Sequence, residues 1–143
     1  MKLRISNNEK EKDLTALLFK KLMDKESPEV IKALLENGAD VNAKTIVGLN
    51  IHTPLMTAIA FCFDTDADII KLLIEFGANV NAKDAYGSTP LFFATLQHNL
   101  EAIKILIEFG ADVNTKNNNG KIALDYAKDS ATEEILKKQW RKL

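Results

Sequence analysis

The side chains in this chain that could bind a metal or act as a nucleophile are a cluster of acids, two histidines and one cysteine. The run Asp64-Thr65-Asp66-Ala67-Asp68, with Glu75 eleven residues after Asp64, has the spacing of four ligand positions in a calcium-binding loop. Such a loop needs glycine at its sixth position, where this chain has Ile69. The segment from Ile69 to Glu75 also belongs to a helix that recurs elsewhere without these acids. We therefore expect a polar connection with Asp66 as a helix cap.

Nucleophilic catalysis by Cys62 would need a histidine and an orienting group beside it. The only histidines are His52 and His98, and neither has a Cys, Asp or Glu at the spacing of a metal site or a catalytic triad. Cys62 is therefore expected to be a partly buried structural thiol. The sequence has no glycine-rich phosphate loop, no zinc-ligand spacing and no Gly-x-Ser-x-Gly elbow. We predict no enzymatic activity, no bound metal and no cofactor.

Three stretches of the chain repeat nearly the same sequence, at residues 34–44, 73–83 and 106–116. Each runs from two aliphatic residues through Glu-x-Gly-Ala-Asp/Asn-Val-Asn to a lysine. The glycines Gly38, Gly77 and Gly110 are 39 and then 33 residues apart, so one unit carries six extra residues. Three of these lie between Lys44 and Thr53. Repetition at this period predicts stacked supersecondary units, each of which buries its apolar face against a neighbour.

Two helices are predicted in each unit. The first begins at Thr53-Pro54 or Thr89-Pro90, where the hydroxyl is expected to accept from a free backbone N–H and proline takes the first helical position. The second ends at the repeated glycine, where the chain must leave through positive φ. Its expected caps are Ser27, Asp66 and Asn99. The stripe that we expect to be buried contains Val30, Ile31, Leu34, Leu35, Ile69, Ile70, Leu73, Ile74, Ala102, Ile103, Leu106 and Ile107.

Turn-forming residues follow each of these glycines and lead to a second glycine, Gly48, Gly87 or Gly120, which predicts a β-hairpin-like finger. Helix, turn, helix and finger at a period of 33 residues, with Thr-Pro-Leu before the first helix and Gly-Ala-Asp-Val-Asn-Ala after the second, resemble the ankyrin repeat family over residues 13–138. The resemblance implies an all-α, ankyrin-type α-solenoid of four stacked helix-turn-helix units in one domain, residues 1–143. The units are expected at about 9–44, 45–83, 84–116 and 117–143, the first and last acting as caps.

The chain departs from the family pattern at several positions. The histidine that usually follows Thr-Pro-Leu is replaced by Met56, Phe92 and Asp125. In the last unit Ile122-Ala123 replaces Thr-Pro, which loses a cap worth about 1 kcal/mol. The second helix of that unit, expected from Glu133 to Trp140, is more polar, as suits a cap.

An asparagine occupies the base of each finger, at Asn42, Asn81 and Asn114. The resemblance implies that this residue could be hydroxylated, as it is in ankyrin-repeat proteins of animal cells. The alternative, which we favour, is that the amide ties down the backbone of the finger.

Composition limits the partners and the compartment. The formal net charge of −1 gives no overall attraction to nucleic acid or to an anionic membrane. The basic residues Lys137, Lys138, Arg141 and Lys142 are expected to form a solvated cap. A single cysteine suits a reducing compartment. With no apolar leader and no run of 18 apolar residues, the sequence favours the cytoplasm, or delivery to a host cell by a route without a cleavable signal peptide.

In ankyrin-like proteins the fingers and first helices line a concave groove, so a partner is expected there. The first finger, residues 45–52, carries four aliphatic residues in a segment that should be exposed. Two interpretations stay open: these residues bind a partner, or they fold back as a small satellite core. The expected contact residues are Ile46, Val47, Leu49, Ile51, His52, Met56, Phe61, Tyr86, Ser88, Phe92, Leu96 and Gln97. For Met56 and Phe92 the favoured alternative is partial burial between repeats, which is usual at that register.

The leading functional hypothesis is therefore a non-catalytic, monomeric protein-protein interaction module that acts as an adaptor, inhibitor or targeting unit. The alternative is a regulatory or targeting domain of a larger enzyme or channel whose active part is absent from this chain. A designed scaffold without a partner is disfavoured, because designed arrays keep their repeats uniform and this chain has irregular insertions.

Overall fold

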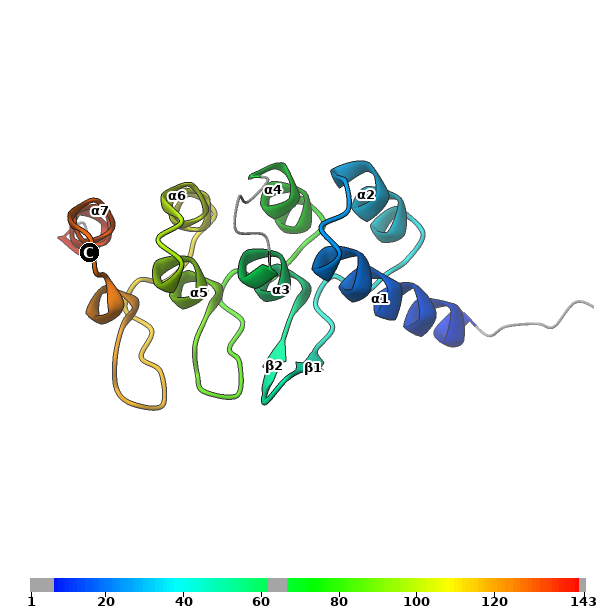
Figure 1. Ribbon diagram of the computed structural model, residues 1–143, viewed down its shortest axis with the longest axis horizontal. Helices are drawn as coiled ribbons and strands as arrows, with labels where there is room; N and C mark the ends of the chain where they lie inside the picture. The colour runs from blue at the N-terminus through cyan, green and yellow to red at the C-terminus, as the bar shows by residue number, and fades with distance from the viewer. Residues whose placement is uncertain (1–6, 62–66, 142–143) are drawn as a thin grey trace, which may run out of the picture.

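The computed structural model describes residues 7–61 and 67–141 of the chain. Within those residues the helices stand in pairs that follow one another along the long axis of the molecule (Figure 1). The pairs are α1 (Asn7–Met23) with α2 (Pro28–Glu36), α3 (Pro54–Phe61) with α4 (Ala67–Glu75), α5 (Pro90–Leu96) with α6 (Leu100–Glu108), and the 3-10 helix η1 (Ala123–Tyr126) with α7 (Ser130–Arg141).

The paired helices form two layers, and the fingers project from one of them. In Figure 1, α1, α3, α5 and η1 make the lower layer and α2, α4, α6 and α7 make the upper layer. Each inner helix packs on its own partner and on the inner helices before and after it, as α3 does with α4, α1 and α5. This arrangement confirms the expected all-α solenoid.

The inner helices α3 and α5 begin where the sequence predicted, at Pro54 and Pro90. Thr53 Oγ1 accepts from the backbone N–H of Met56 at 3.3 Å, so the predicted cap is confirmed there. The same prediction is wrong for Thr89, whose hydroxyl makes no cap hydrogen bond. Pro90 still supplies the fixed φ of a first helical residue, which is enough to start the helix without a side-chain cap.

The outer helices α2, α4 and α6 bury the stripe that the sequence predicted. Their buried core positions are Ile31, Leu34, Leu35, Ile69, Ile70, Leu73, Ala102, Ile103 and Leu106. Val30, Ile74 and Ile107 are half-buried, and Ile105 is buried although the predicted stripe left it out. Asn99 caps α6 by accepting from Ala102 N at 3.0 Å, whereas Ser27 makes no side-chain cap bond.

Each outer helix ends in the same glycine turn. Gly38, Gly77 and Gly110 have φ values of 108°, 95° and 93°, which confirms the predicted exit through positive φ. In the first turn the N–H of Ala39 donates to the carbonyl of Leu34 at 3.0 Å, and the equivalent bond recurs in the other two turns. These turns reverse the chain into the fingers and so fix where every finger starts.

Only the first finger is a true hairpin among the described residues. Strands β1 (Thr45–Val47) and β2 (Asn50–His52) are antiparallel, with Ile46 opposite Ile51. Gly48, with φ of 62°, is the first central residue of the two-residue turn, a position that suits glycine. The second and third fingers are tight turns closed by Asp84 N–H to the Ser88 carbonyl and by Asn117 N–H to the Lys121 carbonyl, each at 2.8 Å. The three extra residues after Lys44 give the first finger the length that a strand pair needs.

The last unit differs from the prediction at both of its helices. The segment after Ile122 forms a single 3-10 turn, Ala123–Tyr126, instead of an α-helix. Helix α7 begins at Ser130, three residues before the predicted start at Glu133, because Asp129 Oδ1 accepts from the N–H of Thr132 at 2.8 Å. The outward positions of α7 are polar, as expected of a cap. Lys138, one repeat after Ile105, is exposed, whereas Ile105 is buried.

Finger-base amides join the first unit to the second and the second unit to the third. Asn42 Oδ1 accepts from the N–H of Asn79 at 2.8 Å, and its Nδ2 donates to the Gly77 carbonyl at 2.9 Å. In the first unit the equivalent acceptor is the hydroxyl of Thr15 on α1, which accepts from the N–H of Asp40 at 2.8 Å. The favoured role of these asparagines as backbone ties therefore holds for Asn42, but the tie runs to the following unit.

Candidate protein-binding surface

The tip of the first finger is apolar and open to solvent. Leu49 is 94% exposed and Ile46 is 78% exposed, while Ile51, the cross-strand neighbour of Ile46, is 39% exposed. Val47 is half-buried. A satellite core would have covered these side chains, so that interpretation of the finger is wrong for three of the four.

Three of the expected contact residues lie inside the protein. Met56 and Phe92 are 0% and 2% exposed, and His52 is 6% exposed, so the expectation that they lie on the accessible surface is wrong. The reason is the close packing of successive inner helices. The ring of Phe92 meets Tyr126 of the next unit edge-on at 5.8 Å between centroids, and His52 meets Phe93 in the same way at 5.1 Å.

The other expected contact residues stay accessible along the fingers and inner helices. Tyr86 and Leu96 are each 54% exposed. Phe61, Ser88 and Gln97 are half-buried, and Gln97 Nε2 donates to the Ala60 carbonyl at 2.9 Å, which links the ends of α5 and α3.

Hydrogen bonds lock the first finger to the second. Asn50 Nδ2 donates to Asp84 Oδ2 at 2.7 Å, and Asn50 Oδ1 accepts from Ile51 N at 2.8 Å and Ala85 N at 3.2 Å. The Tyr86 hydroxyl donates to the Leu49 carbonyl at 3.4 Å. The apolar tip is therefore held in place by its neighbour, which lowers the entropy that a partner must remove on binding.

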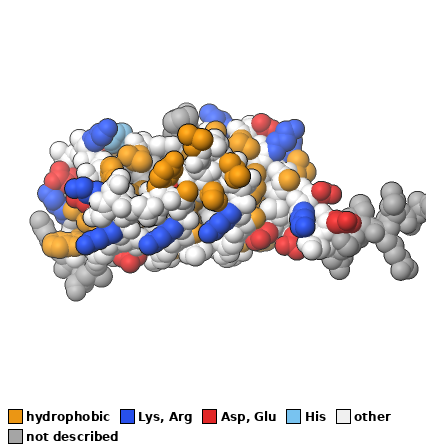
Figure 2. Space-filling model, turned by 90° about the horizontal axis from the view of Figure 1, so that it is seen from below, with side chains coloured by type: hydrophobic (Ala, Val, Ile, Leu, Met, Phe, Trp, Pro, Cys, Tyr) orange, Lys and Arg blue, Asp and Glu red, His pale blue; other side chains and the backbone are white. Residues whose placement is uncertain are grey.

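The second finger is tied to the third in a similar manner. The N–H of Asn118 donates to the Tyr86 carbonyl at 2.9 Å, and Asn118 Nδ2 donates to the Ala85 carbonyl at 3.2 Å. Gly87 is buried in this contact, so close to Asn118 that a Cβ would meet its Oδ1 at 2.7 Å. Figure 2, which views the molecule from the finger side, shows apolar side chains gathered across the resulting face.

A hollow of about 300 Å³ opens between the second and third fingers and the inner helices beneath them. Its apolar lining consists of Tyr86, Phe92, Phe93, Leu96 and Tyr126. Its polar lining consists of Asn50, Asp84, Ser88, Asn117 and Asn119. Phe92, although buried, thus contributes to the floor of the hollow rather than to a projecting contact.

Basic and acidic side chains occupy different parts of this face. Lys44, Lys83 and Lys116 stand at equivalent positions at the start of each finger and are all exposed. Figure 2 shows a row of basic side chains along one edge of the finger face. Asp84 is the one acid that lines the hollow.

The repeated geometry agrees with a comparison of the sequence with protein families. Residues 22–117 and 55–138 each match the family model described as ankyrin repeats (3 copies). The chain belongs to the ankyrin repeat family. Ankyrin repeats are generally protein-protein interaction modules and are typically non-catalytic. No curated protein matches the chain.

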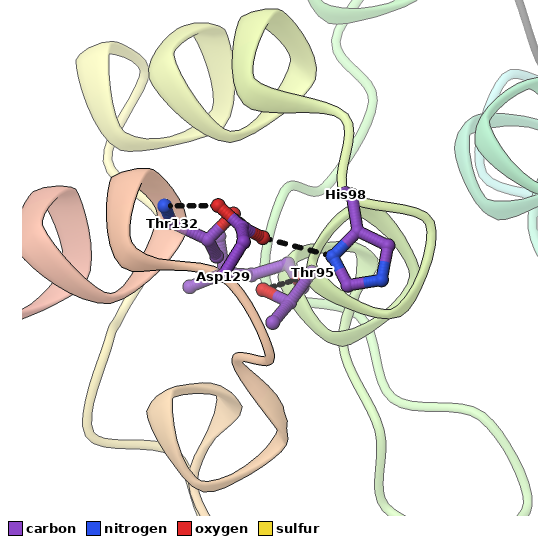
Figure 3. Close-up of polar contacts among 5 residues, drawn as sticks. Thr95, His98, Asp129 and Thr132 are labelled. Atoms are coloured by element: carbon purple, nitrogen blue, oxygen red, sulfur yellow. Dashed lines mark hydrogen bonds and ion pairs between the residues drawn. The ribbon is translucent and has the colours of Figure 1, made fainter.

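The described residues of this ankyrin chain include a histidine-carboxylate pair whose members lie far apart in the sequence. His98 Nδ1 lies 2.8 Å from Asp129 Oδ2, and Figure 3 shows the imidazole and the carboxylate turned toward each other. Thr132 donates its hydroxyl to the same Oδ2 at 2.7 Å and its backbone N–H to Oδ1 at 2.8 Å. These bonds, with the Thr132 N–H contributing most, lower the pKa of Asp129 from 3.8 to about 2.

The order of groups in this cluster does not suit nucleophilic catalysis. A triad needs its hydroxyl bonded to the imidazole, whereas here the hydroxyl of Thr132 bonds to the carboxylate of Asp129. The cluster instead joins the loop after α5 to the start of α7. The two residues are 31 positions apart, close to one repeat, which is the signal that could have found the pair.

Several of the other residues considered for catalysis or metal binding lie outside the described residues. Cys62 and the acids Asp64 and Asp66 of the calcium-like run lie outside the described residues. In the part of the chain that the structure does describe, no group of three or more His, Cys, Asp or Glu side chains could hold a metal ion. No helix within that part is long and apolar enough to cross a membrane.

Proposed function

We propose that this chain is a non-catalytic module that binds a protein partner through its finger surface, defined here as Ile46, Leu49, Ile51, Tyr86 and Leu96. The observation that carries the proposal is the exposure of Ile46 and Leu49 on a finger that is rigidly tied to its neighbour. Apolar side chains held in solvent at a loop tip are typical of interaction sites. The role is that of an adaptor, inhibitor or targeting unit.

Burial of these side chains would contribute a substantial part of the free energy of binding. Complete removal of a leucine or isoleucine side chain from water contributes about 1.5–3 kcal/mol. Two such side chains correspond to roughly a hundred-fold or more in affinity, because each 1.4 kcal/mol is a factor of ten. Tyr86 adds an aromatic residue of the kind that dominates binding hot spots.

The full set of proposed contacts adds the half-buried side chains that border the finger surface. The set consists of Ile46, Val47, Leu49, Ile51, Phe61, Tyr86, Ser88, Leu96 and Gln97. We propose further that residues 1–143 act as one domain with the unit boundaries given above, as a monomer in the cytoplasm, with a protein rather than nucleic acid or a membrane as the partner.

The experiment is affinity capture from extract of the native cell with quantitative mass spectrometry. The test variant is Ile46→Ser/Leu49→Ser, which alters the two most exposed apolar side chains of the finger. The matched control is Phe76→Ser/Phe109→Ser, which alters exposed apolar residues at the ends of α4 and α6. We expect a partner that the wild type and the control retain and that the finger variant loses about ten-fold or more.

The melting temperature separates a lost contact from a lost fold. Because Ile46 and Leu49 are largely exposed, their replacement should leave the thermal midpoint within a few degrees of the wild type. Equal capture by the finger variant would contradict the proposal.

A further inference from the structure

We propose that the hollow between the second and third fingers receives one lysine or arginine side chain of the protein partner, with Asp84 as its counter-charge. The inference rests on the proposed function, because it assigns the chemistry of the residue that anchors the partner in that surface. It starts from the half-buried carboxylate of Asp84, which forms no ion pair with a basic side chain of the described residues.

The hydrogen bonds of Asp84 leave room for one more donor. Its Oδ1 accepts from the N–H groups of Tyr86 at 2.9 Å and Ser88 at 2.8 Å. Its Oδ2 accepts from Asn50 Nδ2 at 2.7 Å. A carboxylate offers about four acceptor positions, so one position on Oδ2 remains for a ligand.

The charge of Asp84 is not needed for the turn of the second finger, although its Oδ2 also accepts from Asn50 of the first finger. The equivalent residue one period later is Asn117, whose Oδ1 accepts from the N–H groups of Asn119 and Lys121, each at 3.0 Å. A neutral amide therefore supports the same turn in the third finger. The carboxylate in the second finger carries a negative charge whose partial burial costs free energy and which a bound cation would offset.

No group of the described residues neutralises that charge. None of their basic side chains forms an ion pair with Asp84. His52 lies near enough to feel the charge, but burial lowers the pKa of its imidazole below 6.5. The imidazole is therefore neutral at pH 7 and supplies no counter-charge.

The rest of the hollow suits the stem of a basic side chain. Tyr86, Phe92, Phe93 and Tyr126 line it with aromatic rings. Such rings cover the methylene groups of lysine or arginine and attract a cation that lies over their faces. An acidic anchor would be repelled by Asp84, and a purely apolar anchor would bury the carboxylate without a counter-charge.

The lysines on the finger edge restrict the rest of the ligand. Lys44, Lys83 and Lys116 are exposed, and none forms an ion pair with another described residue. A segment that is basic throughout would be repelled by this row. The structure therefore assigns the hollow to a single basic residue among neutral or acidic neighbours.

The test is selection of a phage-displayed library of random nonapeptides on the wild-type protein, followed by dissociation constants from fluorescence polarisation. We expect one enriched position to be lysine or arginine. Asp84→Asn should weaken the selected peptides about ten-fold or more, the scale of one charged hydrogen bond. The matched control is Asp112→Asn, an exposed aspartate whose Oδ1 makes the same kind of turn bond, to Asn114 N, outside the hollow. It should change affinity less than about two-fold.

A double-mutant cycle ties the effect to this one contact. Replacing the basic anchor of the peptide by norleucine should lower its affinity for the wild-type protein about as much as Asp84→Asn does. The same replacement should change the affinity for the Asp84→Asn variant little. A tenfold rise in salt concentration should weaken the wild-type complex more than the complex with Asp84→Asn.

The failures of the two proposals are distinguishable. Peptides that Ile46→Ser/Leu49→Ser loses but Asp84→Asn retains would overturn the basic anchor and leave the proposed function standing. Enrichment of acidic or purely apolar anchors would also overturn it. Peptides that bind equally to both variants, or a selection that enriches no peptide, would contradict both proposals.

Discussion

The side-chain amide of Asn81 bonds to Asp112 of the following unit: its Oδ1 accepts from the Asp112 N–H at 2.8 Å, and its Nδ2 donates to the neighbouring Gly110 carbonyl at 3.1 Å. Asn114 occupies the same place one period later, and its amide has no hydrogen bond within the described residues. The chain thus contains a bonded and an unbonded copy of one side chain at equivalent positions.

We expect Asn81→Ala to lower the free energy of unfolding by about 1–3 kcal/mol, because it removes two hydrogen bonds between units and each typically contributes about 0.5–1.5 kcal/mol. Asn114→Ala should cost less than about 0.5 kcal/mol. Urea denaturation of the two variants measures the difference. Equal losses would show that the amide does not join the units.

Gly87→Ala should destabilise the fingers more than Gly120→Ala. Both glycines have positive φ, 76° and 73°, so each substitution carries a similar backbone penalty. A Cβ at Gly87 would also meet Asn118 Oδ1 at 2.7 Å, whereas a Cβ at Gly120 meets nothing within 4 Å. We expect an additional cost of about 1 kcal/mol or more at Gly87 in urea denaturation, with greater amide exchange at Asn118. Identical costs at the two sites would refute this contact.

His52 should make the protein less stable as the pH falls below 6.5. Burial lowers the pKa of its imidazole in the folded state, so the unfolded chain binds the proton first as the solution becomes acidic. Its Nδ1 is buried without a hydrogen-bond partner among the described residues, and the desolvation of the charged imidazole outweighs its attraction to Asp84. An NMR titration should give a pKa below 6.5, and His52→Leu should flatten the dependence of stability on pH below 6.5. A pKa at or above 6.5 would contradict this.

Asp129 should contribute stability that is lost in stronger acid. Its pKa in the folded protein is about 2, below the usual 3.8, so the contribution is complete above about pH 4 and disappears as the pH falls through 2. A carboxyl NMR titration should give the lowered value, and Thr132→Val should raise it by removing the hydroxyl bond. Titration of Asp129 near 3.8 in the wild type would be inconsistent with the bonds described here.

The repeat frame could be predicted from the sequence because each of its determinants is local. The stripe that includes Ile31 and Leu34 follows helical periodicity, and the exit at Gly38 depends on the conformational freedom of glycine alone. The hairpin turn at Gly48 is likewise determined by local sequence. These features need no knowledge of neighbouring units.

The features that sequence reasoning missed depend on contacts between units. Met56 and Phe92 are covered by adjacent inner helices, and periodicity within one helix does not say which face a neighbour covers. The pair of His98 and Asp129 spans 31 residues. Asn50 bonds to Asp84 across 34 residues, again about one repeat. In a stacked repeat protein, residues one period apart are neighbours, so a search for complementary side chains at that spacing could have found both pairs.

Amide hydrogen exchange of the complex with the captured partner would map the binding surface on the intact chain. We expect partner binding to slow exchange in the first finger, residues 45–52, and in the segment 84–97, and to leave exchange in the outer helices α2, α4 and α6 unchanged. Protection confined to the outer helices, with residues 45–52 exchanging as in the free protein, would contradict the proposed binding surface.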